Sequence, residues 1–157
     1  MSAGQHPNGF SAYKYRVEGY SVENAPMPDN VPKVEEVGAT SAPLTSAAYF
    51  LHSHCRDYYD DFMLCKNENN DPAHCLKEGR KVTRCSIDLL KKLEEHCSED
   101  FNKHWNCLDF NNFEYRFCRE PEKVFNACVL KKLGYEKFIP GSNPRKEQVN
   151  KRENPLY

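Results

Sequence analysis

Residues 55–85 read CRDYYDDFMLCKNENNDPAHCLKEGRKVTRC, and residues 97–128 read CSEDFNKHWNCLDFNNFEYRFCREPEKVFNAC. In each stretch a pair of cysteines separated by nine residues is followed by a second pair with the same spacing. All 8 cysteines of the chain lie in these two stretches. A single C-x9-C pair would carry little information, but two successive twin units indicate an internal duplication.

The nine-residue spacing predicts helices. A step of ten residues places both cysteines of a pair on one helix face, about 15 Å apart along the axis. Leu51, Tyr58 and Phe62 continue this face around the first pair. Two such helices packed antiparallel bring the outer cysteines together at one end and the inner cysteines at the other. This geometry predicts four bridges: Cys55–Cys85, Cys65–Cys75, Cys97–Cys128 and Cys107–Cys118.

Turn signals lie between the paired helices. In the first unit, polar residues 67–71 precede Pro72, and Asp71 is a suitable N-cap for a helix with Pro72 at its first position. We expect that helix to run through Leu93 and a new helix to start between residues 98 and 100. Residues 109–112 form the second predicted turn.

The last helix contains a proline. Pro121 would cost about 3 kcal/mol in a helix interior, so we expect this helix to begin near residues 117–118 or to kink there. Gly134 is a suitable C-terminal cap.

We therefore predict an all-α fold of two disulfide-stapled antiparallel helical hairpins, covering residues 45–90 and 91–133. Residues 1–44 and 134–157 are rich in proline and are predicted to be extended arms. Several tyrosines lie in these arms, where no internal core exists, and we interpret them as interface residues rather than caps on the hairpins: Tyr13, Tyr15, Tyr20 and Tyr157.

Composition excludes several classes of function. Charged residues make up 29% of the 157, and the formal net charge is -1. This balance argues against a nucleic-acid binder driven by phosphate neutralisation and against a polybasic membrane-surface protein. The longest apolar run, residues 47–51, is far shorter than the roughly 20 residues that a spanning helix needs.

Cysteine usage indicates an oxidising compartment. The first 30 residues carry neither the apolar segment of a secretory signal nor an Arg-rich amphipathic presequence, and the chain has no Asn-x-Ser/Thr acceptor. We therefore expect the mitochondrial intermembrane space.

The cysteines admit three interpretations, of which we favour structural disulfides. A metal site would be typical of C-x2-C or His-x3-His spacing, which is absent. Three His-Cys neighbours are the nearest hint, but adjacent helical residues point about 100° apart and are not expected to share an ion: His54-Cys55, His74-Cys75 and His96-Cys97. A redox-active pair would normally be C-x-C or C-x-x-C, and the chain has neither.

The chain resembles a known family, the alpha-subcomplex accessory subunit 8 of respiratory complex I, the NADH:ubiquinone oxidoreductase. The resemblance covers roughly residues 45–135 and rests on two complete cysteine quartets with their flanks. Those flanks are Phe62-Met63-Leu64-Cys65, Asp71-Pro72 leading to Cys75-Leu76 and Glu78-Gly79, Trp105-Asn106-Cys107-Leu108-Asp109, and Cys128-Val129-Leu130-Lys131-Lys132-Leu133-Gly134.

The resemblance implies a peripheral subunit of the membrane arm, on the intermembrane-space side of the mitochondrial inner membrane, with other complex I subunits as partners. It implies oxidation during import by the disulfide-relay oxidoreductase, which recognises a hydrophobic face beside a cysteine. Four residues are candidates for that face: Leu51, Tyr58, Phe62 and Leu89. It also implies no flavin, iron–sulfur cluster or quinone. From the missing motifs we expect no catalytic residue and no metal either.

Three hypotheses follow. The first is a non-catalytic structural subunit that supports the assembly and stability of complex I. The second is an assembly factor or metal carrier of the same fold, which would bind copper or zinc. The third is a thiol oxidoreductase, which would need a labile cysteine pair.

Overall fold

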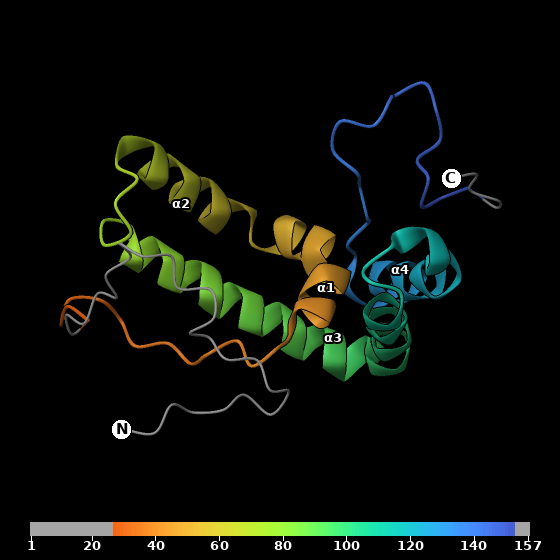
Figure 1. The fold of residues 1–157 in the computed structure, drawn as a ribbon, viewed down its shortest axis with the longest axis horizontal. Coiled ribbons are helices and arrows are strands. Elements are labelled where there is room, and N and C mark those ends of the chain that lie inside the picture. The colour runs from red at the N-terminus through yellow and green to blue at the C-terminus, as the bar shows by residue number, and fades with distance from the viewer. Residues whose placement is uncertain (1–26, 153–157) are drawn as a thin grey trace, which may run out of the picture.

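The fold is all-helical over the part of the chain that the computed structural model describes, residues 27–152 (Figure 1). Its elements are α1 (Ser41–His54), α2 (Arg56–Glu68), α3 (Leu76–Phe110), the 3-10 helix η2 (Tyr115–Phe117) and α4 (Arg119–Leu133). The predicted fold class is confirmed. Most of the predicted N-terminal arm, residues 1–26, lies outside the described residues, as do residues 153–157.

Two helix pairs carry the cysteines. Helix α2 lies beside the first half of α3, and the second half of α3 packs against α4. The two halves of α3 meet at a kink at Cys97, whose φ of -136° and ψ of 29° are not helical. The predicted restart between residues 98 and 100 therefore takes the form of a kink, and the expected boundary between residues 90 and 91 falls inside α3.

The first unit differs from the prediction at both helix starts. The residues from Leu51 to Cys65 do not form one helix. The helix is interrupted at Cys55, which lies between the end of α1 and the start of α2. Asp71 caps a turn rather than a helix: its carboxylate accepts from the Ala73 N–H at 3.1 Å, and its carbonyl accepts from the His74 N–H at 3.1 Å. Helix α3 then begins at Leu76, four residues after Pro72.

The second unit follows the prediction more closely. Helix α4 begins at Arg119, so Pro121 lies in its first turn, where its missing N–H has no intrahelical partner to lose. Gly134 ends α4 in the left-handed conformation with φ of 75°. After the end of α3, Asn112 also takes the left-handed conformation, with φ of 52°. The Phe113 N–H then donates a hydrogen bond to the Leu108 carbonyl at 2.8 Å.

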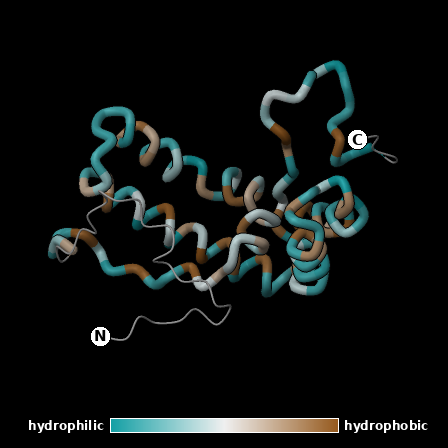
Figure 2. The backbone as a smooth tube through the Cα atoms, in the orientation of Figure 1, coloured by the Kyte–Doolittle hydropathy of each residue, from teal (hydrophilic) through white to brown (hydrophobic). Residues whose placement is uncertain are grey.

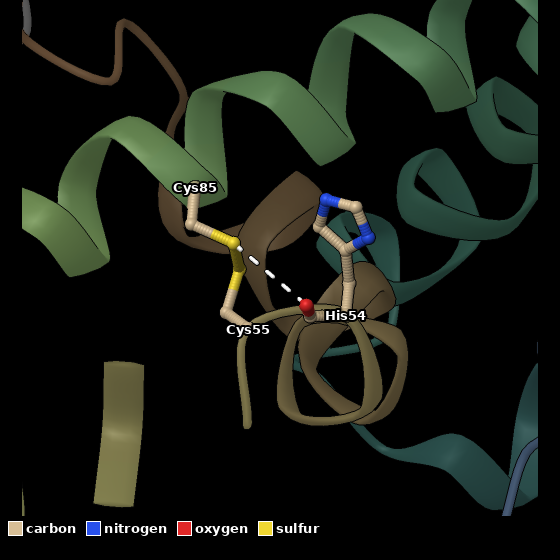
Figure 3. A group of neighbouring side chains, drawn as sticks. All are labelled: His54, Cys55 and Cys85. Carbon is tan, nitrogen blue, oxygen red and sulfur yellow. Dashed lines mark hydrogen bonds between the residues drawn. A yellow bond between two sulfur atoms is a disulfide. The ribbon is translucent and has the colours of Figure 1, made fainter. Parts of the chain in front are cut away.

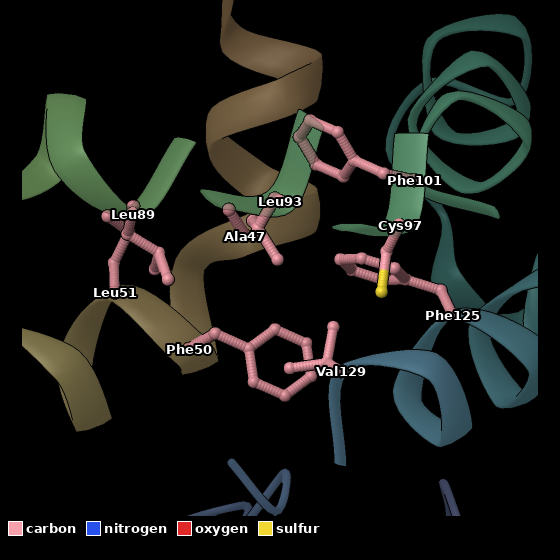
Figure 4. Close-up of a cluster of buried hydrophobic side chains, with 9 residues drawn as sticks. All are labelled: Ala47, Phe50, Leu51, Leu89, Leu93, Cys97, Phe101, Phe125 and Val129. Atoms are coloured by element: carbon pink, nitrogen blue, oxygen red, sulfur yellow. The ribbon is translucent and has the colours of Figure 1, made fainter. Parts of the chain in front are cut away.

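One hydrophobic cluster joins the two units (Figure 4). Helix α1, which precedes the first cysteine, contributes to it alongside α3 and α4. The ring of Phe125 lies at its centre, 5.4 Å from Phe50 in a T-shaped contact and 5.3 Å from Phe101. Helix α2 contributes no buried residue. The full cluster is Ala47, Phe50, Leu51, Leu89, Leu93, Cys97, Phe101, Phe125 and Val129.

The described parts of the two arms have little regular structure. Residues 27–40 precede α1 and contain one turn, and residues 135–152 follow α4 as a succession of turns. Figure 2 shows the loop after residue 140 as mostly hydrophilic. Between residues 27 and 152, no helix is long and apolar enough to cross a membrane.

Candidate functional site

The candidate site is the disulfide framework. In the structure Cys55 is bonded to Cys85 and Cys65 to Cys75 across the first helix pair, with Cα–Cα distances of 5.9 and 6.0 Å. Across the second pair the bridges have Cα–Cα distances of 6.0 and 5.8 Å and join Cys97 to Cys128 and Cys107 to Cys118. No free cysteine remains among the described residues, which include all eight.

Each bridge joins two different kinds of cysteine. The first cysteine of every C-x9-C pair sits at a helix start or at the α3 kink, with φ between -104° and -136° and ψ between 19° and 29°. These four are buried, at 0% to 4% exposure: Cys55, Cys75, Cys97 and Cys118. The second cysteine of each pair lies within a helix and is partly exposed: Cys65, Cys85, Cys107 and Cys128.

The duplication extends to the backbone around three bridges. A carbonyl oxygen from the residue preceding the helix-start cysteine lies against the sulfur of the partner cysteine. The distances are 3.9 Å from His54 to Cys85, 3.7 Å from His96 to Cys128 and 3.8 Å from Phe117 to Cys107. A disulfide sulfur carries no proton, so these are packing contacts, the first of which is dashed in Figure 3.

Two of the three His-Cys neighbours come closer to a second cysteine than expected. A ring nitrogen of His54 and the sulfurs of Cys55 and Cys85 lie within 4.8 Å of one another (Figure 3), as do the corresponding atoms of His74, Cys65 and Cys75. The 100° argument fails here because Cys55 and Cys75 are not inside a helix. Both sulfurs of each group are nevertheless held in a disulfide.

His54 also connects the first bridge to the C-terminal segment. Its Nδ1 lies 2.6 Å from the Tyr135 hydroxyl, and its Nε2 lies 2.9 Å from the Asp88 carboxylate. Lys92 pairs with the same carboxylate at 2.8 Å. The hydrogen bond from Lys92 is the largest cause that lowers the pKa of Asp88, and the one from His54 adds to it.

A buried ion cluster fastens the same segment to α4. The Glu122 carboxylate is 0% exposed and accepts from the Arg119 guanidinium at 2.5 Å and from the Lys137 ammonium. Lys137 is 5% exposed and lies over the rings of Tyr49 and Tyr115, 4.1 and 4.8 Å from their centroids. Burial lowers the pKa of Lys137, while the Glu122 carboxylate opposes that effect.

A histidine is buried beside this cluster. His104 on α3 is 1% exposed, and its Nδ1 lies 2.7 Å from the Ser46 hydroxyl on α1. Burial lowers the pKa of His104 to about 4, so the ring is neutral at physiological pH. The Tyr115 hydroxyl donates to the Thr45 carbonyl at 2.7 Å, and burial raises the pKa of that hydroxyl.

Sequence patterns did not reveal these polar groups. The pairs Lys137–Glu122 and His104–Ser46 carry no spacing signal, because each joins two different segments of the chain. Of the tyrosines singled out in the arms, all four lie outside the described residues. Trp105, in one of the family flanks, packs against the hydrophobic cluster and donates its ring N–H to the Asn102 side-chain oxygen at 2.7 Å.

The fold and the bridges define a class of protein: a double twin C-x9-C helical protein whose paired helices are stapled by disulfides. No family model matches the chain. A 20.8 kDa subunit of NADH-ubiquinone oxidoreductase from Neurospora crassa is 48% identical over 137 residues, which are 86% of this chain and 75% of that protein.

Two plant proteins are also similar. Subunits 8-A and 8-B of the NADH dehydrogenase (ubiquinone) 1 alpha subcomplex of Arabidopsis thaliana are each 34% identical over 93 residues, 59% of this chain and 86% and 88% of theirs. The chain therefore belongs to the family of the alpha-subcomplex subunit 8 of mitochondrial respiratory complex I.

Proposed function

We propose that the chain is a non-catalytic structural subunit of complex I, bound peripherally to the membrane arm on the intermembrane-space side, where it supports assembly and stability. The observation that carries this proposal is the 48% identity with a complex I subunit over 86% of the chain. We further propose that the mature protein contains the four bridges seen in the structure, formed during import by the disulfide-relay oxidoreductase, and that it binds no metal or other cofactor.

The structure supports a rigid role. Every cysteine sulfur is held in a bridge, so the structure has no free thiol among its described residues. One hydrophobic cluster and one buried ion cluster connect α1, the two helix pairs and the segment after α4. A unit tied together in this way can hold neighbouring subunits at a defined spacing.

Native electrophoresis of mitochondrial membranes tests the assignment to complex I. We expect the chain to migrate with assembled complex I and its deletion to reduce the amount of assembled enzyme, with recovery when the wild-type gene is restored. Finding the chain only as a free soluble species, or normal complex I without it, would overturn the structural role.

Topology and composition need separate measurements. Protease added to mitochondria whose outer membrane has been opened should degrade the chain, and alkaline carbonate should release it from the membrane; a matrix-side marker protein provides the control. Non-reducing peptide mapping should return the four bridges. Stoichiometric copper or zinc in the purified protein would favour the carrier hypothesis instead.

A further inference from the structure

Two grooves of opposite charge each give access to one disulfide of the first helix pair. A groove of about 430 Å³ is lined by Cys85, Lys81 and Arg84, with one carboxylate, Asp88. That carboxylate is already paired with Lys92. A second groove of about 630 Å³ exposes Cys65 and is lined by three carboxylates and one lysine: Asp61, Glu68, Glu78 and Lys77.

The two cations of the smaller groove have no competing partner. Lys81 and Arg84 are exposed, and neither forms an ion pair with any residue between 27 and 152. Tyr58 and His54 complete the lining. The groove therefore combines a partly exposed cysteine, two cations without an ion pair among the described residues, and room for a small organic molecule.

The two bridges share one arrangement of their cysteines, although they close loops with sequence separations of 30 and 10. Each presents a partly exposed cysteine within a helix, Cys85 or Cys65. Each hides the other sulfur in a helix-start cysteine, Cys55 at 0% exposure or Cys75 at 1%. The charge of the lining residues is a difference that would change the relative reactivity of the two bridges with the charge of the attacking thiol.

We propose that Cys85 is a site of thiol–disulfide exchange with small anionic thiols, of which glutathione is an example, and that Lys81 and Arg84 select them. The incoming thiolate attacks Sγ of Cys85, and a bond forms between the two sulfurs. The bond between Cys85 and Cys55 breaks, and its electron pair leaves on Cys55 as a thiolate. The product is a mixed disulfide on Cys85, and the reverse attack by Cys55 restores the original bridge.

This exchange goes beyond the structural role and does not depend on it. Because the Cys55–Cys85 bridge holds α2, which contributes no buried residue, the modification would loosen α2 while leaving the shared cluster in place. The Cys65–Cys75 bridge lies in the acidic groove and should repel the same thiols.

The test compares three small thiols on the oxidised full-length chain at equal thiolate concentration and low salt: anionic mercaptoethanesulfonate, neutral 2-mercaptoethanol and cationic cysteamine. After acid quenching, alkylation and peptide mapping report how fast each bridge opens. We expect the ratio of opening at Cys55–Cys85 to opening at Cys65–Cys75 to be roughly ten-fold higher with the anionic than with the cationic thiol, and to converge at high salt.

Charge-reversed variants locate the effect. The double variant Lys81→Glu with Arg84→Glu should abolish the preference for the anionic thiol. Arg145→Glu with Lys146→Glu, which removes one arginine and one lysine from the exposed C-terminal segment, should retain it. An opening ratio that is independent of thiol charge and of salt in the wild-type chain would overturn the proposal, as would an adduct that maps to Cys55.

Discussion

Replacing Lys137 by methionine removes the charge that joins the C-terminal segment to the helical core. In the structure its ammonium pairs with Glu122, which is 0% exposed, and lies 4.1 Å from the ring centroid of Tyr49. Methionine has a similar length and keeps most of the packing, so the substitution chiefly removes the ion pair and the cation–π contacts.

The expected loss in the free energy of unfolding depends on which interactions Glu122 keeps. Breaking a buried pair by removing one partner typically costs about 3–5 kcal/mol, because the other charge stays buried. Here Arg119 still donates to Glu122 at 2.5 Å. We therefore expect the lower end of that range, a decrease of about 3 kcal/mol in the free energy of unfolding, including about 1 kcal/mol from the lost cation–π contacts.

The converse substitution, Glu122→Gln, adds a pH signature. It leaves Lys137 buried without its carboxylate, which lowers the pKa of Lys137 further below its usual value. Between this lowered pKa and the ordinary pKa of lysine, the unfolded chain binds a proton that the folded chain lacks. The free energy of unfolding therefore rises with pH in that interval. The penalty of Glu122→Gln should accordingly shrink as the pH is raised towards 10, whereas the penalty of Lys137→Met should not.

Urea denaturation of the oxidised protein, followed by helical circular dichroism, measures both penalties. Lys151→Met is the matched control, because its pair with Glu136 is at the surface, with 47% and 64% of the side chains exposed. We expect that control to change stability by less than about 0.5 kcal/mol. Two results would refute the coupled buried cluster. One is a loss of less than about 1 kcal/mol in the free energy of unfolding for Lys137→Met. The other is a double variant, Lys137→Met with Glu122→Gln, whose loss equals the sum of the two single losses.

Three further predictions concern the core and the bridges. Burial lowers the pKa of His104 from 6.5 to about 4. The free energy of unfolding should therefore fall by up to about 3 kcal/mol as the pH drops through that interval. Urea titrations at several pH values should show a smaller fall for His104→Gln. Phe125→Ala should cost about 3–5 kcal/mol in the same assay, whereas Phe110→Ala, at 88% exposure, should be nearly neutral; equal losses would contradict the assigned core. Serine at Cys65 and Cys75 should raise hydrogen exchange in α2 and in the first turn of α3, whereas serine at Cys97 and Cys128, beside the shared cluster, should raise it throughout α3 and α4.

Cysteine spacing was sufficient to predict the helix pairs because it is a local, periodic signal. Gly134 and Pro121 were likewise informative, since each acts through its own backbone. The break at Cys55 was missed because the apolar face from Leu51 to Phe62 continues across it. Periodicity reports which side of a helix is apolar and is insensitive to a change of direction at one residue.

The role of α1 could not be read from the sequence for a different reason. Residues 41–44 were assigned to the arm, yet Ala42 is 2% exposed, and later α1 residues enter the shared cluster. Within the shared cluster, the α3 and α4 partners of α1 lie more than 35 residues away, and no pattern within α1 identifies them. Glu122 and Lys137 present the same difficulty, because a buried charge becomes recognisable only when its partner is placed.

The asymmetry of the bridges accounts for the nine residues between the two cysteines of each pair. It also indicates which cysteine of each bridge an attacking thiol meets first. A helix-start cysteine fixes where its helix begins, and a cysteine about 15 Å further along fixes where the partner helix must begin in turn. This arrangement determines the register of both helices even for α2, which contributes no buried residue. The same arrangement leaves one cysteine of each bridge partly exposed, always the one within the helix. Susceptibility to exchange is therefore governed by the charges on the helix face around that sulfur, which differ between Cys65 and Cys85 although their spacing is identical.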